Sequence, residues 1–221
     1  MKAICGFLLL MSVAVAAQAP ARRVIDFESA TPGQAPAGFT FALTGSGRPG
    51  AWSVRKDESS SDRGNVLAQT DADSTSFRFP LAVFNDVTAA DVDISVRFRP
   101  VTGRVDQAAG LVWRYRDANN YYIVRANALE ENVVLYKVEN GKRTDLALKG
   151  SGRTYGKKAP VPKNSWSLLG VTVRGPLFTV SINGQGLYEV EDRTFTNPGK
   201  VGLWTKADSV TYFDDLTIVP R

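Results

Sequence analysis

Histidine is absent from this sequence of 221 residues, and cysteine occurs once, as Cys5. Catalytic Ser-His-Asp and Cys-His arrangements need an imidazole, and zinc sites in proteins rely mainly on His and Cys. The composition therefore excludes both kinds of catalyst and imidazole-bound zinc. Because Cys5 precedes an expected cleavage point, the mature chain is also expected to lack disulfides and thiolate metal sites.

Long apolar segments are scarce as well. The clearest one runs from Phe7 to Val15, after Lys2 and before the small residues Ala17 and Ala19. This order is typical of a secretory signal, which we place at residues 1–19. The apolar run is too short to cross a bilayer, and no later segment approaches the roughly 20 apolar residues that a membrane helix needs. We expect a secreted or periplasmic protein with no membrane span.

The positive charge is small and dispersed. The formal net charge is +5 at pH 7, and lysine and arginine occur throughout the chain rather than in a basic arm or helix. Nucleic-acid binding usually needs such clustering, so no nucleic-acid partner is expected. The roughly 200 residues after the signal, 20–221, fit a single all-β domain. Neither an internal repeat nor a long linker divides them.

Apolar residues recur with period two from Val24 onward, in runs separated by Gly, Pro, Asn and Asp. No window of helical length has a helical period, so the pattern predicts many short strands in a β-sandwich. We expect strands at 24–28, 51–55, 66–69, 76–80, 91–99, 110–116, 121–127, 133–138, 144–148, 166–173, 178–182, 186–190, 200–206 and 210–219.

The segment RYRDANNYYIVR, residues 114–125, predicts a hairpin with residues 117–120 as its loop. Pairing across this loop, across 128–131 and across Asn140-Gly141 predicts a four-stranded meander. Three turns agree on one register, and a slip of one residue would move arginines into the core. One face is apolar and carries Leu111, Trp113, Tyr115, Tyr122, Val124, Ala126, Val133, Leu135, Leu146 and Leu148. The other, the arginine face, collects Arg114, Arg116, Tyr121, Arg125, Asn127, Tyr136 and Asp145.

A family resemblance spans roughly residues 90–219. It is carried by the segments AAGLVWRYRDANNYYIVRAN, LYKVENGKR, WSLLGVTVRGPLFTVSINGQ and KVGLWTKADSVTYFDDLTI. These resemble the concanavalin A-like lectin and glucanase superfamily and, within it, the glycoside-hydrolase-like 3-keto-disaccharide hydrolase domain family. The resemblance implies a jelly-roll sandwich of two antiparallel sheets, with sugars lying across a concave sheet face. That face would be the arginine face.

Two interpretations of the arginine face remain open. Polar residues are expected on the outer face of a sheet, so it could be a solvated surface. Alternatively, its guanidinium and amide groups could bind sugar hydroxyls, with tyrosine adding a flat apolar ring that has a polar end. Trp204 could add a stacking ring, although a large aromatic in an alternating strand is more often core.

A standard pair of glycosidase carboxylates is not evident. Such enzymes need two carboxyl groups about 5–9 Å apart. Glu189 and Glu191 share one face of a strand, but the pattern favours a charged edge strand. Glu130 and Glu131 lie in an expected turn, where acids are usually solvated.

Chemistry on a 3-keto sugar needs fewer groups. The ketone acidifies the neighbouring C–H, so one base and one cation near the developing enolate would suffice. Asp145 or Tyr121 would be the base, and Arg114 or Arg125 would stabilise the enolate.

Acidic residues near the two ends of the chain suggest a calcium site. Asp26 and Glu28 lie in the first expected strand, and Asp214 and Asp215 in the last. First and last strands commonly lie side by side in a jelly roll, and clustered carboxylates suit a structural calcium ion. The alternative is that these acids cap the final turn or pair with nearby cations. No organic cofactor is indicated.

Three functions remain open. The first is a secreted domain that binds a carbohydrate on the arginine face without catalysis. The second is a hydrolase or lyase acting on glycosides, particularly 3-keto-disaccharides, which needs a base with a raised pKa in that groove. The third is a structural envelope domain that binds protein. The oligomeric state is not indicated.

Overall fold

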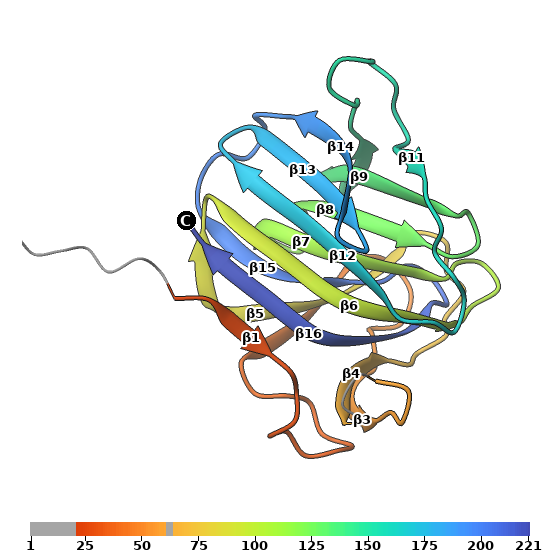
Figure 1. Cartoon of the computed structure of the whole chain (residues 1–221). Coiled ribbons are helices and arrows are strands. Elements are labelled where there is room, and N and C mark those ends of the chain that lie inside the picture. The colour runs from red at the N-terminus through yellow and green to blue at the C-terminus, as the bar shows by residue number, and fades with distance from the viewer. Residues whose placement is uncertain (1–20, 61–63) are drawn as a thin grey trace, which may run out of the picture.

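A computed structural model describes residues 21–60 and 64–221. The expected signal segment, 1–19, lies outside these residues. Within them the chain forms strands and turns, arranged as two curled antiparallel sheets (Figure 1). The predicted all-β jelly-roll sandwich is confirmed. The same residues contain no helix long and apolar enough to cross a membrane.

The two sheets have eight strands each. Sheet A, nearer the viewer in Figure 1, has the order β14 (Gln185–Glu191), β13 (Leu177–Ile182), β12 (Ser167–Arg174), β6 (Val92–Thr102), β16 (Val210–Pro220), β4 (Asn65–Gln69) and β3 (Trp52–Lys56), with β1 (Arg23–Ile25) paired to β16. Sheet B has the order β10 (Lys142–Asp145), β9 (Asn132–Glu139), β8 (Asn120–Asn127), β7 (Ala108–Asp117), β15 (Gly199–Trp204), β5 (Arg78–Ala89) and β2 (Phe39–Gly45), with β11 (Lys157–Lys158) paired to β9.

The predicted meander is confirmed as β7, β8, β9 and β10 in consecutive order. The Asn140-Gly141 turn pairs Glu139 with Lys142, as a two-residue hairpin loop requires. The predicted contact between the first and last strands is also confirmed, because Val24 pairs with Thr217. Local turn chemistry and alternation were sufficient for these elements.

Three strand segments escaped prediction. They are β2, the two-residue β11 and the second half of β5, where Leu81–Phe84 is apolar at four consecutive positions. Ala82 and Phe84 lie in the core between the sheets, whereas Leu81 and Val83 pack on the opposite side of sheet B. A strand buried on both faces loses the period-two signal.

The main core lies between the two sheets. Trp113 is fully buried and packs on Tyr122 and Phe178, with ring centroids 5.6 and 5.2 Å apart. Leu135 on β9 and Val171 on β12 belong to the same cluster. The apolar face predicted for the meander is therefore the face that packs against sheet A.

Sheet B curls so strongly that its other face also becomes a core. Strands β10 and β5 are five strand spacings apart in the sheet order, about 24 Å if the sheet were flat. Yet the Arg143 guanidinium on β10 lies 4.7 Å from the Phe79 ring centroid on β5. The curl encloses a second buried group, called the curl cluster, made of Phe79, Leu81, Val83, Ala108, Val112, Tyr121, Ile123, Val134, Tyr136, Val138 and Trp204.

A bulge in β7 changes the predicted register of the first hairpin. Trp113 pairs with Tyr122, the residue expected opposite Tyr115, and regular pairing resumes only at Asp117. Arg114 has a φ of 47°, in the left-handed region. Gly199 on β15 makes room for the bulge, because a Cβ there would lie 2.5 Å from the Arg114 carbonyl carbon. The bulge moves Arg114 off the arginine face and puts Tyr115 against Tyr121.

Candidate functional site

Most of the predicted arginine face exists, but it is enclosed. Tyr121, Arg125 and Asn127 are fully buried, and Tyr136 is 2% exposed. Asp145 pairs directly with Tyr136, so it lies on the same face, at the partly buried sheet edge. Both sequence interpretations are corrected for these residues: the curl makes their face neither a solvated surface nor an open groove.

Arg114 was wrongly placed on this face. Its Nε donates to the Ala90 carbonyl at 2.9 Å, and its two Nη groups donate to the Phe195 and Gly175 carbonyls, each at 2.7 Å. The side chain is 2% exposed. It therefore ties loops of both sheets together and has no free edge for a sugar or an enolate. Arg116, inside the bulge, is exposed to solvent.

Arg125 is the centre of a polar cluster at the rim of the curl. Its two Nη groups each donate to a Glu130 carboxylate oxygen at 3.0 Å, and one of them also donates to Asn132 Oδ1 at 2.8 Å. The Tyr155 hydroxyl donates to Glu130 at 2.6 Å. Glu130, expected to be solvated in a turn, is instead held by four residues, since the side-chain amides of Asn127 and Asn132 also donate to it at 3.2 and 3.0 Å.

A surface cavity of about 290 Å³ opens beside this cluster. The β8–β9 turn and the segment before β11 form its walls. Its lining residues are Leu129, Glu130, Glu131, Asn132, Arg153, Tyr155 and Lys158. The cluster thus lies beside a space open to solvent.

The Glu130 cluster makes stability depend on acid pH. Burial raises the pKa of Glu130, but hydrogen bonds from Tyr155 and Arg125 outweigh it, so the pKa falls from 4.5 to about 2. A pKa lowered in the folded state contributes stability that is complete above the unfolded value and is lost as the pH falls towards the folded value. We expect urea midpoints to drop between about pH 4.5 and 2, and Glu130→Gln to flatten that drop. Glu131→Gln, at the exposed neighbour, is the control; equal slopes for Glu130→Gln and wild type would contradict the assignment.

Arg143 lies inside the curl beside the same cluster. Its guanidinium carbon is 4.5 Å from the Tyr136 ring centroid, 4.7 Å from that of Phe79 and 5.9 Å from that of Trp204. The Arg143 side chain is only partly buried. It therefore covers aromatic rings of the curl cluster and is also in contact with solvent. Trp204 itself is fully buried, which confirms the core interpretation of that residue.

Two polar atoms at this point have no hydrogen-bond partner among the described residues. They are Nη1 of Arg143 and the hydroxyl of Tyr136, and both are enclosed. Buried polar groups in native proteins are usually paired, and an exception calls for an unseen water, ion or ligand. Burial raises the pKa of the Tyr136 phenol, so this hydroxyl is protonated and able to donate.

Two exposed aromatic rings contact neighbours of Arg143. Phe77 is 44% exposed and its ring contacts that of Phe79, with centroids 4.8 Å apart. Tyr155 is 48% exposed, and its ring lies 5.8 Å from the Arg125 guanidinium. Large exposed aromatics beside a partly exposed guanidinium form a mixed apolar and polar surface, called the curl mouth below.

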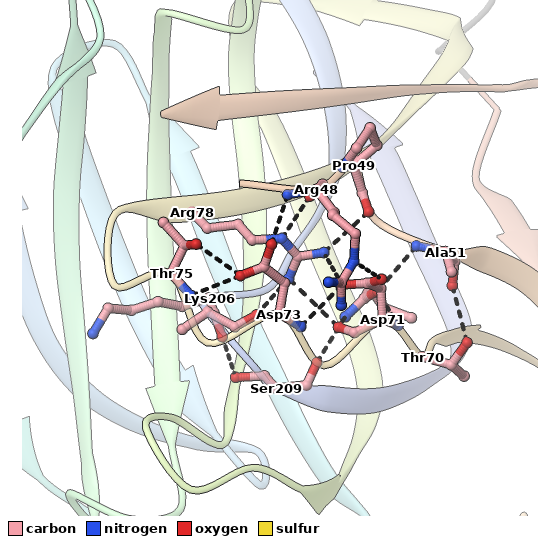
Figure 2. A network of polar contacts seen from close by, with 12 residues as sticks. Arg48, Pro49, Ala51, Thr70, Asp71, Asp73, Thr75, Arg78, Lys206 and Ser209 are labelled. Atoms are coloured by element: carbon pink, nitrogen blue, oxygen red, sulfur yellow. Dashed lines mark hydrogen bonds and ion pairs between the residues drawn. The ribbon is translucent and has the colours of Figure 1, made fainter. Parts of the chain in front are cut away.

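A network around Arg78 fixes the loops on the Phe77 side (Figure 2). Arg78 is fully buried and donates to the Arg48, Pro49 and Ala207 carbonyls and to the Asp71 carboxylate. Its donors are therefore used within the protein. We assign it a structural role, in contrast to Arg143.

The four acids predicted to bind calcium do not gather. Asp26 and Glu28 are exposed, and a Glu28 carboxylate oxygen accepts from the backbone N–H of Asn65 at 2.5 Å. Asp214 is buried, whereas the next residue, Asp215, faces Arg97 at 3.8 Å. In the part of the chain that the structure describes, no group of three or more His, Cys, Asp or Glu residues is placed to hold a metal ion.

The other catalytic candidates are also located. Glu189 and Glu191 lie on β14, at the edge of sheet A, which confirms the edge-strand interpretation. The Tyr121 hydroxyl lies 2.8 Å from the Thr44 hydroxyl in the closed curl. Burial raises the Tyr121 pKa far above neutrality, so Tyr121 is a poor base.

Sequence reasoning missed four residues of the curl mouth and its rim: Phe77, Glu130, Arg143 and Tyr155. A signal existed for Arg143, because alternation from Asp145 puts it on the same face of β10. Phe77 lies in the strand expected at 76–80 but just before the observed β5, and Tyr155 lies in an irregular segment, so alternation did not point to either as a site residue. Only tertiary structure brings them to one place.

No protein-family model and no curated protein matches the chain. Solved structures do match. The carbohydrate-binding module CBM66 from Bacillus subtilis is 22% identical, with a TM-score of 0.59 over 82% of this chain and 95% of that chain. Domain 4 of the arabinanase AbnA from Geobacillus stearothermophilus, solved with arabinotriose, is 15% identical, with a TM-score of 0.57 over 92% of each chain. The cellulose-induced protein Cip1 is 13% identical, with a TM-score of 0.59 over 90% of this chain and 97% of that chain. At these identities the likeness shows the shared fold.

Proposed function

We propose that this protein is a secreted or periplasmic carbohydrate-recognising domain that binds a glycan at the curl mouth. The observation that carries the proposal is the Arg143 guanidinium, partly exposed, resting on three aromatic rings and next to an unpartnered Tyr136 hydroxyl. Phe77, which contacts Phe79, and Tyr155, which contacts Arg125, add exposed rings to this surface.

This chemistry suits a sugar ring. The apolar face of a pyranose or furanose can stack on an aromatic side chain, while guanidinium and phenol groups make directional hydrogen bonds to its hydroxyls. The site combines apolar lining with a few polar groups, as ligand sites usually do. Structural neighbours described as a carbohydrate-binding module and as a domain in complex with arabinotriose further support a glycan ligand.

A second candidate is hydrolysis of 3-keto-disaccharides, which the family resemblance implies. Of the two proposed bases, Asp145 is the better candidate, because it is partly exposed on the curl face whereas Tyr121 is buried and protonated. Arg125 could stabilise an enolate only by exchanging its Glu130 contacts. We therefore rank binding without catalysis first.

Ligand-observed NMR of the purified mature protein with neutral and acidic glycans and 3-keto-glycosides tests both candidates. Line broadening without product over several hours is the expected result. New anomeric signals that disappear in Asp145→Asn would favour the hydrolase. The absence of any response to every sugar would contradict both and favour the structural, protein-binding alternative.

The exposed Tyr155 ring gives a specific prediction. We expect Tyr155→Ala to weaken glycan binding by about threefold to tenfold, the range of one aromatic stacking contact. Tyr155→Phe keeps the ring but loses the bond to Glu130, so it should bind nearly as well as wild type. Tyr212→Ala, on sheet A, is the control for loss of a ring elsewhere. Calorimetric titration with a glycan identified by NMR measures all three; equal affinity of Tyr155→Ala and wild type would remove Tyr155 from the site.

A further inference from the structure

Arg143 differs from the other arginines that lie largely inside the protein in having no ion-pair partner among the described residues. Arg78 pairs with Asp71, Arg99 with Asp57, Arg114 with Asp91 and Arg125 with Glu130. Across residues 21–60 and 64–221, no ion pair or hydrogen bond of the Arg143 side chain is found, and its Nη1 is enclosed without a partner.

The nearby acids are engaged elsewhere or lie too far away. The Asp106 carboxylate binds Lys206 and Asn127, and the Glu130 carboxylate binds Arg125 and Tyr155. Asp145, two residues along the same strand face, is beyond ion-pair distance of Arg143. Among the described residues, Arg143 therefore has no carboxylate within ion-pair distance, and Asp106 acts on it only through longer-range electrostatics.

The aromatic rings around Arg143 stabilise a cation but do not replace an anion. A ring attracts a cation through its π-electrons but accepts no strong hydrogen bond, so the N–H groups of the guanidinium still need acceptors. A guanidinium edge matches the two oxygens of a carboxylate. The Tyr136 hydroxyl adds a second unpartnered donor at the same place.

We infer that the glycan bound at the curl mouth is acidic, and that Arg143 donates hydrogen bonds to the carboxylate of a uronic acid residue, with Tyr136 as the second donor. The inference rests on the proposed function and adds the class of sugar. A sulfated sugar also carries a negative charge, so the experiment compares a uronic acid carboxylate with a sugar sulfate. Because no hydrogen bond fixes the Arg143 side chain, it can turn from the rings towards the ligand without breaking one.

Calorimetric titration of the mature protein tests this with matched probes. They are short oligosaccharides of galacturonic, glucuronic and mannuronic acid, the same oligosaccharides after reduction of their carboxyl groups to alcohols, and sulfated galacto-oligosaccharides. We expect at least one uronic acid series to bind about tenfold or more tightly than its reduced counterpart, as one charge-assisted hydrogen bond allows. The ratio of the affinities for the acidic and the reduced probe should fall as the sodium chloride concentration rises, because salt screens the charge interaction.

Variants of one strand identify the residue responsible. Arg143→Gln should reduce affinity for the acidic probe to that of its reduced counterpart, whereas Lys142→Gln, with the same charge change at an exposed neighbour, should not. Arg143→Lys keeps the charge and should retain a weaker preference. If Arg143→Gln fails to fold, the inference is tested by the salt dependence of acidic-probe binding in wild type and in Arg143→Lys. A preference for the acidic probe that does not change with salt in either protein would contradict it.

The outcomes distinguish failure of the acidic-sugar inference from failure of glycan binding itself. Equal binding of acidic and reduced probes overturns the acidic ligand but leaves glycan binding in place. A preference that survives in Arg143→Gln overturns the role of Arg143. Preference for the sulfated probes over every uronic acid series overturns the carboxylate and assigns a sulfate. Failure of all probes, neutral and acidic, overturns the proposed function itself.

Discussion

Arg114→Met is expected to lower the free energy of unfolding by about 3–5 kcal/mol, the loss typical of breaking a buried charged network. Arg114 donates to the carbonyls of Ala90, Phe195 and Gly175, and each of these would lose a partner in a buried region. An unpaired buried carbonyl costs about 1–3 kcal/mol. Urea denaturation followed by tryptophan fluorescence measures the change.

Arg116→Met is the matched control for Arg114→Met. It lies two residues away in the same bulge, is exposed, and should change stability by no more than about 0.5 kcal/mol. If both variants unfold at the same urea concentration, the structural role of Arg114 is wrong. A folded Arg114→Met protein should still bind glycan, because Arg114 does not reach the curl mouth.

Arg78→Met is expected to cost a similar amount, about 3–5 kcal/mol. Arg78 joins three separate segments, because it donates to the carbonyls of Arg48 and Pro49 in one, to that of Ala207 in the second and to the Asp71 carboxylate in the third (Figure 2). Its side chain is 0% exposed. Methionine fills much of the volume but supplies no donor, so the three carbonyls would lose the bond from Arg78, and Asp71 would keep its ion pair with the exposed Arg48.

Hydrogen exchange should locate the damage from Arg78→Met. Faster exchange is expected in residues 46–51, 70–77 and 205–209, the segments that meet at Arg78, while β8 and β9 stay protected. Arg48→Met is the control, because its side chain is 66% exposed and its ion pair with Asp71 is worth about 1 kcal/mol or less. Uniformly faster exchange over the whole chain would contradict a local role for Arg78.

Alternation in the sequence predicted the position of one meander arginine correctly and of another wrongly. Alternation put Arg114 and Arg125 on one face, and it was right for Arg125. It failed for Arg114 because a bulge breaks the alternation, and the bulge depends on Gly199, a residue on a strand 85 positions later in the chain. Local patterns carry no information about such a neighbour.

The curl explains why the nature of the arginine face was misjudged. Period two distinguishes the two faces of a strand, but it does not say whether a face meets solvent. Phe79 on β5 and Arg143 on β10 come into contact only because sheet B bends through five strand spacings. Twist and curl accumulate over a whole sheet, so a single hairpin does not predict them.

The sequence by itself determined the all-β class, the order and register of most of the meander, and the absence of histidine chemistry. Side-chain alternation and the Asn140-Gly141 turn depend only on residues close together in the chain, and composition does not depend on residue order at all. Only the tertiary structure decided that Arg114 and Arg78 are structural, that Glu130 is paired, and that Arg143 is left without an anion. Those outcomes depend on distances between strands remote in the chain, and long-range packing sets such distances.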